Sequence, residues 1–168
     1  IDPNVFNNTR KDVIRDSKEF TVGWSGDYSN KIKNFQLVRN SCLDAKVKLV
    51  VAKDLNRNDL NVWYNNIDAV ICASKAEGGP LMLLEAGACC IPVITTPVGL
   101  AREIIKHEEN GLLVDWNIES ISEAIKKYKN DKNERARMAK NLHKAVINKW
   151  TYEYRIKEAR GVFKELCR

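Results

Sequence analysis

Long hydrophobic runs are missing from this 168-residue sequence, although 44% of its residues are hydrophobic. No stretch approaches the ~18 consecutive apolar residues that would predict a membrane-spanning helix, and no secretory signal pattern stands at its front. We therefore expect a cytoplasmic protein. Any contact with a membrane would be peripheral and at the inner face.

The familiar motifs of metal sites are also absent. The sequence has no C-x-x-C pair, only two histidines and no D-x-D motif, so a zinc site is not predicted, no motif requires another metal, and no cofactor is expected. The cysteines are odd in number and lie mostly in apolar surroundings, which favours reduced, buried thiols over disulfides or a redox site. They are Cys42, Cys72, Cys89, Cys90 and Cys167.

Positive charge is in excess, with a net charge of +6, and it gathers between residues 126 and 149. Such a stretch is most often a solvated helix surface, and docking on anionic lipid is the alternative. Aromatic side chains do not interleave with these cations as they do in single-strand binding grooves, so nucleic acid is not a predicted partner. The cations are Lys126, Lys127, Lys129, Lys132, Arg135, Arg137, Lys140, Lys144 and Lys149.

Short apolar runs alternate with helical patterns up to Asp115, and only helical patterns follow. This alternation is typical of βαβ units and predicts an α/β fold, a parallel sheet with helices on both faces. The expected strands are residues 20–24, 46–52, 69–73, 92–96 and 111–115. The expected helices are residues 31–42, 59–66, 80–88 and 101–106, followed by three more that Asn117, Asp131 and Thr151 would cap.

Two glycine-bearing loops follow predicted strands, one at residues 23–33 and one at 74–80. Ligands of open parallel sheets bind beyond the carboxyl ends of the strands, so these loops are the candidate site. Neither loop has the G-x-G-x-x-G or the Lys-Ser/Thr of a named phosphate fingerprint. Pro80 suits the first helical position. The free amides of Leu81 and Met82 would then face a diphosphate.

Two acids, Glu77 and Glu85, flank this predicted anion site, and Gly78 and Gly79 leave it open because they lack side chains. The simpler interpretation is a loop with two solvated carboxylates. The alternative is that Glu85 accepts hydrogen bonds from a ribose diol and Glu77 from a sugar hydroxyl. A nucleotide sugar fits the alternative, because neutral polar groups flank its charged centre.

The stretch ASKAEGGPLMLLEAGACCIPVITTPVGLAREII, followed by ENGLLVD, resembles the retaining glycosyltransferases of family 4. The segments NNIDAVICAS, IDPNVF and KWTYEY are similar to further parts of these proteins, so the resemblance covers nearly the whole chain. The matching residues of the main pattern are Ser74, Glu77, Gly78, Pro80, Glu85, Ala86, Pro92, Val93, Ile94, Thr96, Gly99, Glu103, Ile105, Asn110, Gly111 and Leu113.

The resemblance implies one half of a GT-B architecture, which has two Rossmann-like domains. Residues 1–19 would be the interdomain linker, and residues 20–168 the nucleotide-sugar-binding Rossmann-like domain with its C-terminal helices. The N-terminal acceptor domain would lie outside this chain, which begins with Ile1 rather than Met. We therefore expect this chain to bind donor and to be inactive alone.

The resemblance also implies roles for single residues. Glu77 is similar to the glutamate that faces the transferred sugar, Glu85 to the one that holds the ribose, and Lys33 to the phosphate lysine. Glu77 and Lys33 are the catalytic candidates. The full donor-binding set is Gly26, Lys31, Lys33, Glu77, Gly78, Gly79, Pro80, Leu81, Met82 and Glu85.

Several residues depart from the family pattern. Asn34 replaces the glycine after the phosphate lysine, and Cys90 and Leu100 stand at two further glycine positions. The usual arginine after the first glycine turn is absent, and Asp27 stands in that region. Lys31, or an arginine from elsewhere, would have to supply the second cation.

The implied reaction transfers a sugar from a nucleotide sugar to an acceptor hydroxyl, with retention of configuration, in glycan or glycolipid synthesis. The partners would be the donor and an acceptor glycan or lipid-linked glycan. Two alternatives stay open: a sugar-nucleotide epimerase of the same architecture, and a non-catalytic nucleotide-sugar-binding module. Interconversion of free nucleotide sugars without an acceptor would favour the epimerase. Failure to bind any nucleotide would favour a non-catalytic module whose site has decayed.

Overall fold

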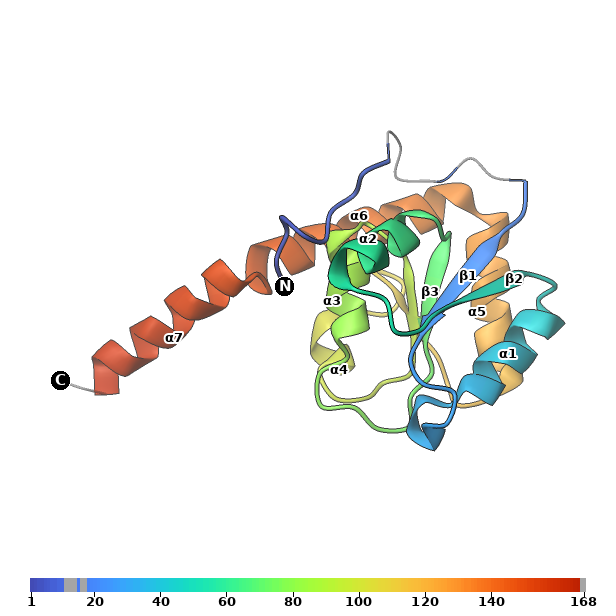
Figure 1. Ribbon diagram of the computed structural model, residues 1–168, viewed down its shortest axis with the longest axis horizontal. Helices are drawn as coiled ribbons and strands as arrows, with labels where there is room; N and C mark the ends of the chain where they lie inside the picture. Colours follow the sequence, from blue (N-terminus) through green and yellow to red (C-terminus); the bar gives the residue numbers. More distant parts are fainter. Residues whose placement is uncertain (11–14, 16–17, 167–168) are drawn as a thin grey trace.

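The computed structural model describes residues 1–10, 15 and 18–166 (Figure 1). Its centre is a five-stranded, wholly parallel sheet in the order β2-β1-β3-β4-β5. This confirms the α/β fold that the alternation of apolar runs and helical patterns predicts. The strands are β1 (Thr21–Ser25), β2 (Lys48–Ala52), β3 (Ala69–Cys72), β4 (Val93–Thr95) and β5 (Leu112–Leu113).

The helices follow the predicted order, with one difference. Residues 31–42 are not a single helix, because Asn34 adopts a left-handed conformation (φ 55°) and separates a 3-10 turn, η1 (Lys31–Lys33), from α1. Asn tolerates this conformation better than most residues other than glycine. The α-helices are α1 (Phe35–Asp44), α2 (Arg57–Asn65), α3 (Leu81–Ala88), α4 (Ala101–Ile104), α5 (Ile118–Asn130), α6 (Lys132–Lys149) and α7 (Tyr152–Leu166).

Helices cover both faces of the sheet, and each face has its own apolar core. One core contains Tyr64 of α2 and Leu83 of α3. The other contains Val38 of α1 and Ile125 of α5. Helix α6 contributes Leu142 to the first core and Met138 to the second, so it ties the two sides together.

The predicted caps are present in the C-terminal helices. The side chains of Asn117 and Asp131 accept hydrogen bonds from the backbone N–H groups of Ser120 and Glu134. The hydroxyl of Thr151 accepts one from the N–H of Tyr154, at 3.3 Å. Helix α7 projects away from the domain and has no buried residue (Figure 1).

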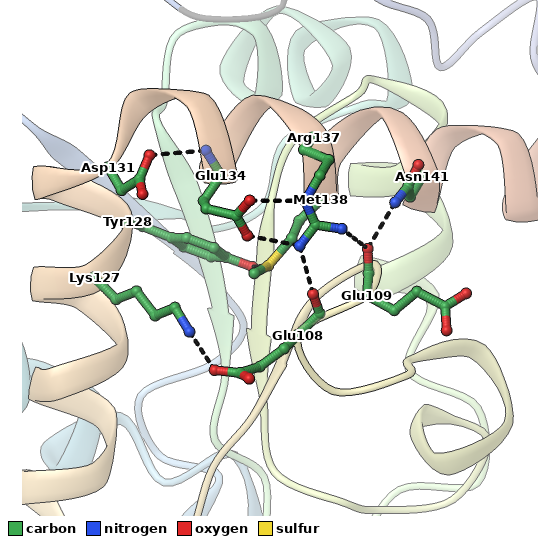
Figure 2. A network of polar contacts seen from close by, with 9 residues as sticks. All are labelled: Glu108, Glu109, Lys127, Tyr128, Asp131, Glu134, Arg137, Met138 and Asn141. Atoms are coloured by element: carbon green, nitrogen blue, oxygen red, sulfur yellow. Dashed lines mark hydrogen bonds and ion pairs between the residues drawn. The ribbon is translucent and has the colours of Figure 1, made fainter.

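Two cations of the basic stretch, Lys127 and Arg137, make the internal contacts that Figure 2 shows. Arg137 pairs with Glu134 and also donates to the backbone carbonyls of Glu108 and Glu109, while Lys127 pairs with the carboxylate of Glu108. Arg135 is buried rather than solvated. These contacts hold the loop before β5 against α5 and α6. At these positions the cations therefore contact other parts of the protein and not solvent alone.

The opening residues pack against the domain. Phe6 is buried and makes an edge-to-face ring contact with Tyr64, and the N–H groups of Asn7 and Thr9 donate to side chains of α2. The N–H of Tyr152 donates to the carbonyl of Ile1, which brings the opening residues beside the start of α7. The linker assignment of residues 1–19 remains a prediction.

Four of the predicted buried thiols are confirmed: Cys42, Cys72, Cys89 and Cys90 are free and buried. Cys167 lies outside the described residues. Within the described part of the chain, no helix combines the length and apolarity that crossing a membrane requires.

A buried ion pair anchors the start of the sheet. Asp68 precedes β3, and its carboxylate accepts from Arg15 at 2.6 Å and from the backbone N–H of Thr21 at 2.7 Å. The Asp68 side chain is 2% exposed and that of Arg15 is 24% exposed. This carboxylate therefore satisfies the backbone N–H of Thr21 and balances the charge of Arg15, whose guanidinium also donates to the hydroxyl of Thr21 and the carbonyl of Glu19.

We predict that Asp68→Ala lowers the free energy of unfolding by about 3 kcal/mol, because it leaves Arg15 without its partner in a low-dielectric setting. Urea denaturation measures the change. Glu158→Ala, which breaks the exposed pair with Arg155 on α7, is the matched control and should have a much smaller effect. Equal losses of unfolding free energy in the two variants would show that burial does not make the Asp68 pair more stabilising than an exposed pair.

Candidate functional site

The candidate site lies at the carboxyl ends of β1 and β3, which are neighbours in the sheet. The chain order reverses there, because β1 connects outward to β2 on one side and β3 continues on the other. Such a switch point leaves a crevice between two loops, and open parallel sheets bind ligands in it. The two loops are residues 26–34 and 73–80, the same pair that the glycine pattern predicts.

The first loop is shaped by short polar turns. Asp27 accepts from the backbone N–H of Ser29, and this hydrogen bond lowers the pKa of its carboxyl. Asn30 accepts from the N–H of Ile32 and caps η1. Gly26 has φ +156°, and a Cβ at this position would lie 3.0 Å from the Trp24 ring and 3.6 Å from the Lys33 side chain. The loop therefore delivers Lys33 alongside Gly26.

The structure brings Lys33 and Glu77 into direct contact. The Nζ of Lys33 donates to Oε1 of Glu77 at 2.6 Å, and the hydroxyl of Ser74 donates to the same oxygen at 2.8 Å. The Lys33 and Glu77 side chains are 32% and 15% exposed. The sequence predicts that both residues bind one ligand, but it does not predict that they bind each other.

The loop that follows β4 packs against the glycine turn at Gly78 and Gly79. Gly99 has φ +46°, and a Cβ there would lie 2.1 Å from the carbonyl oxygen of Glu77, so only glycine fits. The N–H of Leu100 donates to the carbonyl of Gly78, and a Cβ added at Gly79 would lie 3.0 Å from the Leu100 side chain. Leu100, at a position where the family pattern has glycine, thus packs against the turn.

Helix α3 begins one residue later than predicted. Pro80 has an extended conformation and is the N-cap, so Leu81 is the first helical residue. The carbonyl of Pro80 accepts from the N–H of Leu83. Among the described residues, the N–H groups of Leu81 and Met82 have no acceptor. The first turn of a helix leaves such donors free, and they carry partial positive charge.

Glu85 lies farther along α3 and is one of the residues that line a hollow of about 280 Å³. Its Oε2 accepts from the hydroxyl of Tyr64 at 2.8 Å. Burial raises the pKa of this carboxyl, while the Tyr64 hydrogen bond and the charge of Arg57 oppose the shift. Leu81 and Arg57 line the same hollow. A half-buried acid with one oxygen still available can accept hydrogen bonds from a neutral diol.

Several contributors were not predicted from the sequence. Tyr64 and Arg57, both on α2, interact with Glu85. Trp116 donates its Nε1–H to the carbonyl of Ser74 at 2.9 Å. No short motif marks these residues, because the contacts join distant parts of the chain. Lys31 is exposed on η1, and no contact of its ammonium group with Lys33 or Glu77 is found in the described structure. Within the same residues, no group of three or more His, Cys, Asp or Glu side chains could hold a metal ion.

Comparisons with known proteins show which family this fold and sequence are similar to. An uncharacterized glycosyltransferase of Methanocaldococcus jannaschii is 29% identical over 155 residues, which are 92% of this chain and 39% of that protein. The C-terminal domain of the group 1 glycosyl transferase LpcC from Francisella tularensis superposes with a TM-score of 0.75 at 23% identity, covering 90% of this chain and 99% of that domain.

HepE of Anabaena, in a crystal structure with UDP, superposes with a TM-score of 0.79 at 17% identity, covering 98% of this chain and 56% of HepE. This chain therefore spans about half or less of the longer proteins that it matches. The family described as glycosyl transferases group 1 matches residues 21–145, which include both loops, α3 and most of α6. On this match, the chain belongs to the group 1 glycosyl transferase family.

Proposed function

We propose that this chain is the donor-binding half of a retaining glycosyltransferase, which moves a sugar from a nucleotide sugar to an acceptor hydroxyl in glycan or glycolipid synthesis. The observation that carries the proposal is the joint placement of Lys33 and Glu77 on loops beside α3. Family membership and the UDP complex of HepE support it. The remainder of the protein would bind the acceptor, a glycan or lipid-linked glycan.

In the proposed complex the diphosphate lies against the N–H groups of Leu81 and Met82. The leaving nucleoside diphosphate gains negative charge as the glycosidic bond breaks. Fixed amides and a lysine ammonium stabilise that charge without reorganising, and this electrostatic contribution is usually the largest in such sites. Lys33 has three N–H donors, so it can bind a phosphate oxygen and keep its contact with Glu77.

Glu77 and Glu85 hold the neutral ends of the donor in this proposal. Glu77 is fixed by Ser74 and Lys33, and it orients the transferred sugar through a hydroxyl. Glu85, at the hollow beside Arg57, accepts from the ribose diol. We assign no covalent intermediate to Glu77, since its carboxylate is already engaged by two donors.

The direct experiment is a thermal-melting screen of the chain with nucleoside diphosphates. We predict that a matching diphosphate such as UDP at 100 times its dissociation constant adds about 2.7 kcal/mol of stability, because it binds only the folded state. The corresponding nucleoside without phosphates is the control and should stabilise far less. No shift with any nucleoside diphosphate at millimolar concentration would contradict donor binding and favour a decayed site.

The two acids should differ in their effects on binding, as isothermal titration calorimetry can measure. We predict that Glu85→Gln weakens binding of UDP and of its sugar conjugates alike, because both ligands contain the ribose. Glu77→Gln should weaken binding of the conjugates only. Binding of UDP should not weaken, because the positive charge of Lys33 is then no longer neutralised by Glu77. Equal effects of the two substitutions on both ligands would show that this division of roles is wrong.

Glu85 should also give a pH-dependent stability difference. Burial raises its pKa above the ordinary 4.5, so the folded state resists ionisation and loses stability as pH rises from that value through the raised pKa. We predict that ligand-free Glu85→Gln melts above the wild type at pH 7 and that the difference vanishes below pH 4.5. Melting curves between pH 4 and 8 test this, and a difference that does not change with pH would contradict it.

A further inference from the structure

One peptide group, between Ser74 and Lys75, connects the two loops of the site. Its N–H donates to the carbonyl of Ile32 in η1 at 2.9 Å, one residue from Lys33. Its carbonyl belongs to Ser74, whose hydroxyl donates to Glu77. The orientation of this peptide group therefore affects the positions of both Lys33 and Glu77.

Two side chains hold the carbonyl of this peptide group. The hydroxyl of Thr96, just after β4, donates to the Ser74 oxygen at 2.7 Å, and Nε1 of Trp116 donates to the same oxygen at 2.9 Å. Ser74 and Thr96 are buried. A carbonyl oxygen has two lone pairs, so both bonds can form at once and together restrict rotation of the peptide plane.

Trp116 is an unexpected donor for this position. It follows β5 at the far edge of the sheet, and its side chain reaches past the end of β4 to the end of β3. The residue is still 42% exposed, so burial of its ring is incomplete. Thr96 alone would satisfy the buried carbonyl. Trp116 adds a second hydrogen bond to the same carbonyl oxygen, so the peptide group is restrained from two directions.

We infer that Trp116 is a positioning residue of the donor site, which fixes the Ser74–Lys75 peptide group and through it the carboxylate of Glu77. The inference rests on the proposed function, in which Glu77 contacts the transferred sugar. Loss of the indole N–H therefore reduces the preference of the site for the sugar conjugate over the plain diphosphate. It leaves binding of the plain diphosphate nearly unchanged, because the α3 amides do not depend on Trp116 and Lys33 is linked to this peptide group only through the backbone carbonyl of Ile32.

The test compares wild-type chain with Trp116→Phe, which keeps an aromatic ring and removes the donor. Calorimetry measures the affinities for UDP and for UDP-glucose, UDP-galactose and UDP-N-acetylglucosamine, and the conjugate that wild type prefers over UDP is used. One hydrogen bond corresponds to a change of about fivefold, so Trp116→Phe should reduce that preference about fivefold while changing UDP affinity less than twofold.

Trp63→Phe is the matched control. It makes the same chemical change at a tryptophan whose buried Nε1 has no partner among the described residues, and it should lower the melting temperature without altering the preference. Ser74→Ala supplies the second comparison, because it removes the hydroxyl that joins Ser74 to Glu77. Trp116→Phe added to Ser74→Ala should reduce the preference no further, as expected for two residues that act through one contact.

Each other outcome overturns the inference. Equal weakening of UDP and its conjugate by Trp116→Phe would mean that the indole only supports the fold. An unchanged preference in Trp116→Phe together with a loss in Trp116→Ala would make the ring itself a sugar-contacting surface. A wild-type chain that binds no nucleoside diphosphate and no conjugate would refute the proposed function as well, whereas a wild-type preference that survives in Trp116→Phe refutes only the role of Trp116.

Discussion

The ion pair between Lys33 and Glu77 is the interaction on which the rest of the site depends. It joins two loops that are 44 residues apart in sequence and that meet only because β1 and β3 are parallel neighbours. Both side chains are largely shielded from water, so the pair is less screened than a surface contact. The glycine turn and the start of α3 take their positions from the same loop that carries Glu77.

This pair also bears on how an anion could be bound beside two acids. Without a cation nearby, Glu77 would repel a diphosphate at the α3 N-terminus. Lys33 offsets that charge and retains donors for a phosphate oxygen. Glu85 avoids the conflict differently, since it lies farther along the helix, where its carboxylate accepts from the hydroxyl of Tyr64. The arrangement suits a ligand whose charged centre has neutral polar groups on both sides.

The sequence predicts the local elements well and the contacts between them poorly. The alternation of apolar runs predicts all five strands, and the glycine loops, with Glu77 and Glu85, indicate the candidate site, which stays a prediction. The break at Asn34 and the N-cap role of Pro80 depend on backbone conformations that a helical pattern does not determine. Tyr64, Thr96 and Trp116 reach the site through tertiary contacts, and a single sequence has no short-range signal for these.

The most direct test of the account is a ¹H–¹⁵N NMR titration of the chain with UDP. We predict the largest chemical-shift changes at the amides of Leu81 and Met82, where free N–H groups would meet the diphosphate. Changes around Lys33 should be smaller, and the amides of α5 should be unaffected. Saturable changes centred on another surface, with Leu81 and Met82 unmoved, would show that the α3 N-terminus is not the diphosphate site.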